Sequence, residues 1–528
     1  MDVSHVKSLI GNVITREDLK EVIEILRPIA INNQSMQITD LIKDALEKSK
    51  CIEDFELAIF LYDLQIRQIY HLNDHLDQIC DIISEMKHLA KRVNSANCNA
   101  LVKQLTWYVE KLKGNKERSS LSINEAMKLV ESGCIDDSYT YFSVKYSYAI
   151  EEWLEHDNHN VTNLLEDCVS YFLEKAMYRS FAQSLGILSV IYQRTNNYRE
   201  AEKTSEKILG NRSLMEKLSP DIKSIVYYFT GVGQLLQSNL SNAEIYFNEA
   251  LMILEQTQAS LYYNYYYVRT ISHIATIKAL LGNWESAFSN MKKIETLIQD
   301  TKITKNFDNH SINQVPHTFN LIKFYIYSRL KSFEHSDNQD LIESIFNKLE
   351  RQYSHPILLI EFILNSSLEK DRLEILIKSD FDNLKRVKHI INYELLKKKK
   401  IWNKQDNLAK NCIEILEEGM NTKKRTYLEA AFTDLLIAKE LFSLGDYEGI
   451  YLLLRKYSNR TDRLEVLEFR IFMEAFIQVG AYKTGNPLGP ALQYMAIKKC
   501  KQYGFSRLED KLLEYLTIQG NDALRLIV

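Results

Sequence analysis

The sequence predicts an all-α protein, and three observations lead to that expectation. Glycine and proline are rare, with 16 and 6 residues in a chain of 528, together about 4 % against an average near 12 %. No proline occurs between Ile29 and Ser219, and no glycine between Asn283 and Glu418. Within these stretches apolar residues recur at spacings of three and four, which is the period of an amphipathic helix. Successive helices are therefore expected along most of the chain.

Charge and cysteine content disfavour several classes of protein. Lys plus Arg number 66 against 70 for Asp plus Glu, a net charge of −4, whereas proteins that bind nucleic acid or anionic membranes directly are usually basic. The seven cysteines are odd in number and form no C-x-x-C pair, so a reducing cytoplasm is expected, without disulfides or structural zinc. No signal peptide and no membrane-length apolar run are found.

Polar turns divide the helical stretches into segments that pair as hairpins. The segments expected to be helical are Arg16–Pro28, Gln37–Lys48, Glu53–His71, Asp74–Val93, Cys98–Lys113, Ser122–Ser132, Ser138–Glu155, Val161–Met177, Leu341–Tyr353, Leu358–Leu364 and Leu408–Glu417. The polar stretch Thr301–Gln314 is expected to be a loop.

Residues 182–298 contain three copies of one pattern, in which a small residue of a first helix is followed by a turn, a large residue and an alanine. The small residues are Ser189, Gly231 and Ala275; the large ones are Tyr198, Leu240 and Trp284; the alanines are Ala201, Ala243 and Ala287. Small residues on both helices let two antiparallel helices approach closely, while the large residue packs over the turn. Ala438 and Gly445-Asp446-Tyr447 give a fourth copy, and Gly485-Asn486-Pro487 a weaker fifth.

These segments resemble tetratricopeptide repeats, with longer helices than usual because successive alanines are 42 and 44 residues apart (Ala201 to Ala243 to Ala287). The resemblance implies a right-handed superhelical solenoid of antiparallel helical hairpins, with divergent hairpins on both sides and a C-terminal capping helix. The expected divisions are short helices in 1–50, divergent hairpins in 51–180, the repeat core in 181–298, a loop and divergent helices in 299–420, and repeat-like hairpins with the cap in 421–528.

The order of these parts, together with the ending Gly520-Asn521-Asp522-Ala523-Leu524-Arg525-Leu526-Ile527-Val528, is similar to the cytosolic peptide-pheromone receptors of Gram-positive bacteria and their phages, particularly the arbitrium receptors. That resemblance implies a regulatory receptor that binds a short peptide. It also implies that the receptor forms a dimer. No DNA-binding helix-turn-helix is recognised in residues 1–50, so direct control of transcription is not expected.

The apolar C-terminal end leads to a separate prediction about burial of the tail. Leucines at helical spacing precede Gly520, and the chain ends on Leu524, Leu526, Ile527 and Val528, where most termini are polar and frayed. This tail is expected to be buried, either as a cap on its own array or against a second copy of the chain.

Candidate ligand-binding residues follow from the repeat pattern. Tetratricopeptide arrays bind extended peptides along a concave face lined by the first helix of each hairpin. The candidates on that face are Gln183, Tyr228, Tyr265, Arg269, Ser272 and Thr276. Arg269 directly follows the tyrosine-rich run Tyr262–Tyr267; it is suited to a peptide carboxylate, while most of the tyrosines are expected to pack between helices.

Other constellations are better explained by structure than by chemistry. His71 and His75 have metal-ligand spacing but flank an expected turn, and Thr230-Gly231-Val232-Gly233 lacks the lysine of a phosphate loop. The basic run Lys397–Lys400 is expected to be a solvated helix end. No catalytic grouping, metal or cofactor site is recognised.

The function that the sequence favours is therefore a non-enzymatic helical-repeat receptor or adaptor that binds a short peptide or protein segment. Two alternatives remain open at this point: a phosphatase-like or otherwise inhibitory regulator of a signalling partner, and a passive assembly scaffold.

Overall fold

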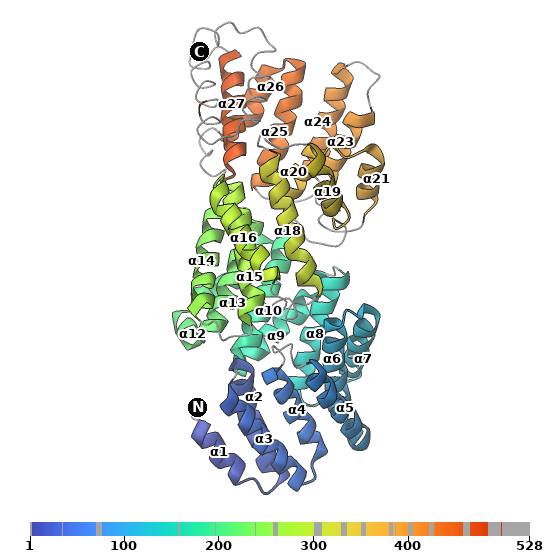
Figure 1. Cartoon of the computed structure of the whole chain (residues 1–528), viewed down its shortest axis with the longest axis vertical. Coiled ribbons are helices and arrows are strands. Elements are labelled where there is room, and N and C mark those ends of the chain that lie inside the picture. The colour runs from blue at the N-terminus through green and yellow to red at the C-terminus, as the bar shows by residue number, and fades with distance from the viewer. Residues whose placement is uncertain are drawn as a thin grey trace. The chain divides into compact units, whose positions relative to one another are not determined.

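The computed structural model describes a helical protein (Figure 1). The described residues are 3–33, 35–69, 76–156, 159–195, 197–237, 239–256, 262–299, 309–328, 335–349, 355–379, 384–385, 387–399, 405–421, 427–457, 465–483 and 498. They contain helices and turns and no strand, which confirms the all-α prediction. The right-handed superhelical path stays a prediction, and the weak fifth repeat copy and the tail beyond Gly520 lie outside the described residues.

The chain divides into two compact units. The first consists of Met1–Gly233, Tyr246–Thr270 and Thr296–Ile312, and the second of Gln234–Ile245, Ile271–Glu295 and Asn313–Val528. Helices α13, α14, α15, α16 and α18 contribute residues to both units.

The helices up to the end of the three clear repeats follow the expected order. They are α1 (Val3–Gly11), α2 (Arg16–Asn32), α3 (Met36–Cys51), α4 (Phe55–Ile69), α5 (Leu76–Val93), α6 (Ala96–Leu112), α7 (Lys116–Glu131), α8 (Ser138–His156), α9 (Thr162–Glu174), α10 (Tyr178–Arg194), α11 (Tyr198–Leu209), α12 (Arg212–Lys217), α13 (Pro220–Leu236), α14 (Leu240–Gln256), α15 (Tyr262–Leu280) and α16 (Trp284–Gln299).

The remaining helices are shorter on average. They are α18 (Asn309–Tyr327), α19 (His335–Phe346), α20 (Pro356–Asn365), α21 (Lys370–Lys378), α23 (Lys388–Lys399), α24 (Gln405–Asn421), α25 (Tyr427–Leu444), α26 (Tyr447–Leu454) and α27 (Leu467–Lys483). Short 3₁₀ turns cover His159–Val161 and Arg455–Tyr457.

Several sequence-based boundaries were wrong. Helix α7 begins at Lys116 instead of Ser122, and α19 covers His335–Phe346 instead of Leu341–Tyr353. Two further differences have a clear physical reason. The expected loop Thr301–Gln314 is helical from Asn309 onward, because α18 carries a buried face of His317, Phe319, Leu321 and Ile322 directly behind its polar first turns. Helix α2 does not end at Pro28 but continues to Asn32, because Ala30 and Ile31 are buried beyond the proline. Burial of an apolar face decided both cases against local turn signals.

The repeat pattern has the packing that its small residues predicted. In the first copy the Ser189 hydroxyl lies 3.5 Å from the carbonyl oxygen of Ala201, so α10 and α11 are in close contact. In the third copy Ala275 and Ala287 are fully buried, and Gly282 ends α15 at a φ of +80°. In the fourth, Gly445 takes a φ of +73° and the Asp446 carboxylate accepts a hydrogen bond from the amide of Gly449 at the start of α26.

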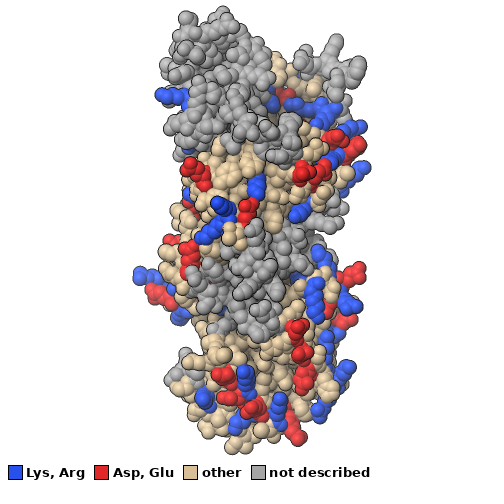
Figure 2. All heavy atoms as spheres, in the orientation of Figure 1, with Lys and Arg blue, Asp and Glu red and all other residues tan. Residues whose placement is uncertain are grey.

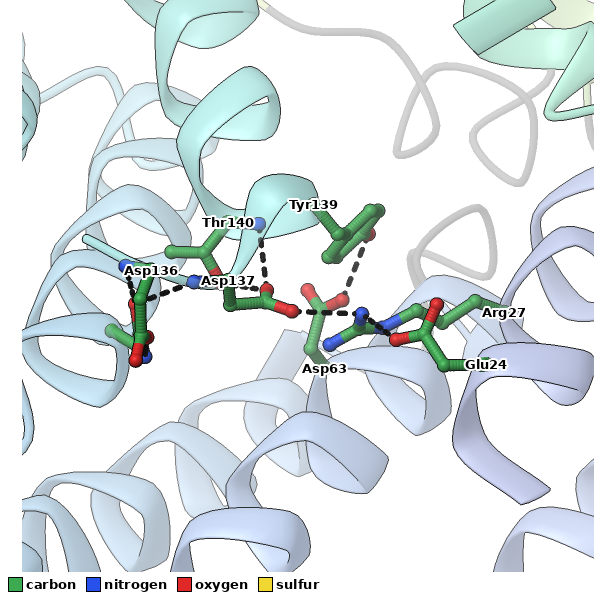
Figure 3. Close-up of polar contacts among 8 residues, drawn as sticks. Glu24, Arg27, Asp63, Asp136, Asp137, Tyr139 and Thr140 are labelled. Carbon is green, nitrogen blue, oxygen red and sulfur yellow. Dashed lines mark hydrogen bonds and ion pairs between the residues drawn. The ribbon is translucent and has the colours of Figure 1, made fainter. Parts of the chain in front are cut away.

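A buried polar cluster joins the N-terminal helices α2, α4 and α8 (Figure 3). The Arg27 guanidinium, 3 % exposed, donates to Asp137 at 2.9 Å and to Glu24 at 2.8 Å, and it lies 4.7 Å from the centre of the Tyr139 ring. The Asp63 carboxylate accepts from the Tyr139 hydroxyl at 3.0 Å and from Arg67 at 2.9 Å. We name these residues the Arg27 cluster; burial raises the pKa of Tyr139, which keeps its hydroxyl protonated.

In the second unit, buried carboxylates likewise tie helices together. Tyr393 on α23 donates to Glu440 on α25 at 2.6 Å, and Tyr457 donates to Asp434 on α25 at 2.6 Å. The Glu465 carboxylate, just ahead of α27, accepts from the amide of Ser241 in the first turn of α14 at 2.9 Å. An acidic group at a helix N-terminus is favourable both as a hydrogen-bond acceptor and through the helix dipole.

Among the helices that the structure describes, none is long and apolar enough to span a membrane.

Overpacking one helix crossing tests the repeat geometry. We expect Ala287→Leu to lower the free energy of unfolding by about 1–3 kcal/mol, because three added carbon atoms must fit at a crossing that leaves no exposed surface. Urea unfolding monitored by circular dichroism measures the change. Ser289→Leu, at an exposed position on the same helix, is the control and should be near neutral; an equal loss in both variants would contradict the assignment.

Buried His317 on α18 predicts a pH-dependent loss of stability. Burial, with Lys348 nearby, lowers its pKa from 6.5 to about 4, so it is neutral in the folded protein. Between these two pH values the unfolded chain binds more protons than the folded one, so stability falls as the pH falls from about 6.5 to 4, by up to about 3 kcal/mol.

Replacement by a group that does not titrate isolates this contribution. In His317→Gln the loss of stability between pH 7 and pH 5 should be smaller than in wild type, whereas His88→Gln, at an exposed site, should leave it unchanged. Urea unfolding at both pH values provides the comparison, and identical slopes in wild type and His317→Gln would refute the assignment.

Candidate functional site

The six candidate residues lie on the first helices of the three clear repeats. Gln183 is on α10 and half-buried, and Tyr228 is on α13 with 4 % of its surface exposed. Arg269, half-buried, and the buried Ser272 and Thr276 are on α15. Tyr265 is also on α15, but its side chain lies outside the described residues.

The structure brings two of the candidates into direct contact. The Tyr228 hydroxyl lies beside the Arg269 guanidinium and is coupled to it electrostatically, although the two residues are 41 positions apart in the sequence. Burial raises the pKa of Tyr228 while the neighbouring guanidinium lowers it, and the rise is the larger effect. The hydroxyl is therefore protonated across the physiological range, and it fixes one side of a half-buried arginine. Thr276 instead donates to the carbonyl of Ser272 within its own helix at 3.0 Å.

Helices α10 and α13 approach closely at a glycine. A Cβ atom on Gly186 would lie 2.3 Å from the nearest atom of the Phe229 ring, so a larger residue would displace that ring. A Cβ atom on Gly231 of α13 would similarly lie 2.9 Å from the Phe247 ring of α14. A glycine in the middle of a helix lowers the stability of that helix. Here the aromatic rings that pack into the space beside each glycine offset this cost.

Aromatic rings extend this contact from α13 to α15. The Tyr266 ring meets Tyr228 edge-on with centroids 5.0 Å apart, and Phe229 at 6.3 Å. Tyr228 also packs against Phe247 at 6.0 Å. We name Phe229, Tyr228, Tyr266 and Phe247, together with Arg269, the aromatic layer. Edge-to-face pairs of this kind are each worth about 0.5–1.5 kcal/mol beyond their buried area, so the packed rings hold Tyr228 in place beside Arg269.

Two side chains of the tyrosine-rich run Tyr262–Tyr267 that are described, those of Tyr266 and Tyr267, are buried. Tyr266 and Tyr267 are 4 % and 5 % exposed, and the Tyr267 hydroxyl donates to Glu255 of α14 at 3.3 Å. These two pack between helices, which confirms that expectation for them. The side chains of Tyr262, Tyr263 and Tyr265 lie outside the described residues.

Sequence reasoning missed Phe229 as part of the aromatic layer, and it missed the contact of Phe229 with Gly186. Glycine in the middle of a strongly apolar helix was the available signal, because such a residue usually marks a close approach of another element. Which ring fills the space came only from the fold.

The glycine pair of α13, the basic run and the histidine pair, considered above as possible chemical sites, are described next by their surroundings. Thr230–Gly233 lies inside helix α13 and forms no phosphate-binding loop. Lys397 is not fully solvated, because its ammonium lies 3.3 Å from Glu440 and 3.0 Å from the Tyr393 hydroxyl. His71 and His75 lie outside the described residues, and within the described ones no group of three or more His, Cys, Asp or Glu could hold a metal ion.

Charged residues of both signs alternate over the described part of the face drawn in Figure 2, where no large patch of one sign is seen. Several charges of the described residues are paired across helices, such as Lys145 with Asp167 at 3.1 Å and Lys111 with the buried Glu151 at 2.8 Å. Electrostatic attraction of a polyanion is therefore not a feature of that face.

Comparisons with known proteins give a distant likeness. No model of a known family matches the chain, and no curated protein matches it. Among solved structures it is similar to the apo form of the quorum sensor NprR from B. thuringiensis, with 17 % identity and a TM-score of 0.43, over 71 % of this chain and 98 % of that one. It is also similar to NprR in complex with its cognate peptide NprX, with 16 % identity and a TM-score of 0.44, over 72 % and 99 %. At these values, the proposals below rest on this chain's own residues.

Proposed function

We propose that the protein is a non-enzymatic receptor that binds a short peptide or protein segment against the first helices of its repeats. The observation that carries the proposal is the aromatic layer, in which Tyr228 packs against Tyr266 and Phe247 and lies beside Arg269. A peptide presents amide groups, apolar side chains and carboxylates, and an aromatic surface with one guanidinium can contact all three.

The arrangement favours a carboxylate near Arg269. Arginine can bind both oxygens of a carboxylate through two parallel hydrogen bonds, and a guanidinium that is already held in place loses less conformational entropy on binding. Tyr228 has little exposed surface, so we assign it to positioning Arg269 rather than to contact with the ligand. Gln183, Tyr265, Ser272 and Thr276 remain the further candidates for the binding face.

The proposal also includes a regulatory role in the cytoplasm, without catalysis or cofactor. The buried thiols of Cys98 and Cys168 agree with a reducing compartment, because burial raises their pKa to about 12 and keeps them protonated and unreactive. The two alternative functions are inhibition of a signalling partner and passive scaffolding. Both differ from the proposal in the ligand, because each requires a folded partner protein instead of a free peptide.

Selection from a library of short linear peptides against the full-length protein tests the proposal. Enriched peptides should bind in calorimetry and raise the melting temperature, because a ligand that binds the folded state alone stabilises it. A library that yields no binder, together with capture of a folded partner, would favour the alternatives.

Removal of the guanidinium is the sharpest test at the level of a residue. Arg269→Ala should weaken binding of a selected peptide by roughly 10- to 150-fold, the equivalent of about 1.5–3 kcal/mol for a charge-assisted hydrogen bond. Calorimetry measures the affinity, and the free energy of unfolding should change little. Lys278→Ala is the matched control, because it removes a cation of the same helix that pairs with Glu244. Equal affinities of wild type and Arg269→Ala would rule out this site.

We further propose that the receptor is a homodimer formed through its C-terminal tail. The support is the apolar end of the sequence, Leu524, Leu526, Ile527 and Val528, whose burial is worth about 1.5–3 kcal/mol for each side chain as an upper bound. A two-fold interface between identical tails would bury it.

Deletion of residues 523–528 tests the dimer. Light scattering at micromolar concentration should give the mass of a dimer for the full-length chain and that of a folded monomer for the shortened one. A full-length chain that is already monomeric would leave the tail as an intramolecular cap.

A further inference from the structure

We propose that Asn32, Arg179 and Asp221 form a joint that sets the spacing of α10 and α13 from the N-terminal helices, so that these residues position the binding face without contacting the ligand. The inference deepens the proposed function, and it rests on that function for the role of α10 and α13 in binding. All residues of the joint belong to the first compact unit.

The first half of the joint connects α2 with the start of α10. Asn32, the last residue of α2, donates from its side-chain amide to the carbonyl of Ala176 at 2.7 Å. Its side-chain oxygen accepts from the backbone amide of Arg179 at 3.2 Å. One asparagine thus satisfies a donor and an acceptor on two sides of the turn that leads into α10, about 145 residues further along the chain.

That turn has little freedom of its own. Helix α9 ends in a motif in which the amide of Met177 bonds to the carbonyl of Phe172 at 2.8 Å, and that of Ala176 to Leu173 at 3.1 Å. Ala176 takes a φ of +53°, a backbone conformation that residues other than glycine rarely adopt. Because the turn is short and constrained, any shift of α2 at Asn32 is passed to the first turn of α10.

The second half of the joint connects α10 with α13. The Arg179 side chain is 6 % exposed, and its guanidinium forms an ion pair with Asp221 in the first turn of α13. Asp221 also accepts a hydrogen bond from the Ser219 hydroxyl. A buried arginine is stable only while its carboxylate partner stays in place, so the ion pair holds the starts of α10 and α13 at one distance.

Helix α2 is itself held at the other end of the joint. The Arg27 cluster connects it to α4 and α8 five residues before Asn32 (Figure 3). Partly buried hydrogen bonds therefore lead from the N-terminal helices through Asn32 and Arg179 to α13, where Tyr228 and Phe229 lie two turns further along. The spacing of α10 and α13, which Gly186 and Phe229 require to be close, is thus set partly from outside the binding face.

Hydrogen exchange of the full-length protein, followed by mass spectrometry, tests the joint without any ligand. Asn32→Ala should speed exchange about tenfold both in residues 181–184 of α10 and in residues 223–226 of α13, since two hydrogen bonds are lost. Arg179→Lys should speed exchange by a similar factor in residues 223–226, because lysine cannot reproduce the planar guanidinium contact. Asn290→Ala is the matched control, since among the contacts of the described residues its side-chain amide bonds only to the carbonyl of Ser286 within α16, and neither segment should change.

The decisive readout is α13 in the Asn32 variant, because Asn32 does not touch that helix in the contacts described. Faster exchange confined to residues 181–184 would overturn the joint. Should Asn32→Ala fail to fold, Asn32→Asp retains the acceptor for the Arg179 amide and loses the donor to Ala176, and the same comparison applies.

Binding separates this inference from the function on which it rests. Asn32→Ala should weaken a selected peptide about tenfold while Asn290→Ala does not. If Asn32→Ala speeds hydrogen exchange but leaves the affinity for the peptide unchanged, the positioning role is overturned. If no peptide is selected at all, the proposed function fails, and the exchange data still decide whether the joint exists.

Discussion

Close approach between antiparallel helices is the constraint on which the rest of this structure depends. A helix of a repeat must bury its apolar side on its hairpin partner and also on the neighbouring hairpin, and it can do so only where small residues let the backbones come near. Ala201, Ala275 and Ala287 are fully or almost fully buried at such crossings. At Gly186 even one carbon atom would meet the Phe229 ring. A gap of about 0.5–1 Å between packed atoms forfeits a quarter to a half of their dispersion energy, so a crossing that is slightly too wide loses a large part of its packing energy.

Buried polar groups then decide how the hairpins are oriented. Apolar packing alone allows many rotations of one helix on another with little difference in energy, whereas a buried charge allows very few. Arg27 between Glu24 and Asp137, and Arg179 opposite Asp221, are ion pairs of this kind in the first unit. Tyr393 and Tyr457 on Glu440 and Asp434 serve the same purpose in the second. Such pairs add little net stability because desolvation costs nearly as much as the attraction returns, but displacing one partner is expensive.

The candidate site combines both constraints. The aromatic layer exists because glycine leaves space for Phe229, and Arg269 is held because the Tyr228 hydroxyl is buried next to it. A rigid support of this kind lowers the entropy that a binding side chain loses on contact with a ligand. The same arrangement explains why residues far from the site, at the ends of α10 and α13, are expected to influence it.

The sequence by itself determined the helical class, most helix positions and the repeat pattern, because all three depend on local periodicity and on the scarcity of glycine and proline. It also placed Tyr228 and Arg269 on neighbouring first helices. It failed at Asn309–Gln314, where polar residues read as a loop while the apolar residues behind them supplied the packing that makes the helix. Contacts between distant positions were decided by tertiary structure alone: Arg27 with Asp137, Asn32 with the turn before α10, and Gly186 with Phe229. Nothing in the residues near Asn32 indicates a partner about 145 positions away, because hydrogen-bond geometry depends on where the backbone has been placed, and only the completed packing of the helices fixes that.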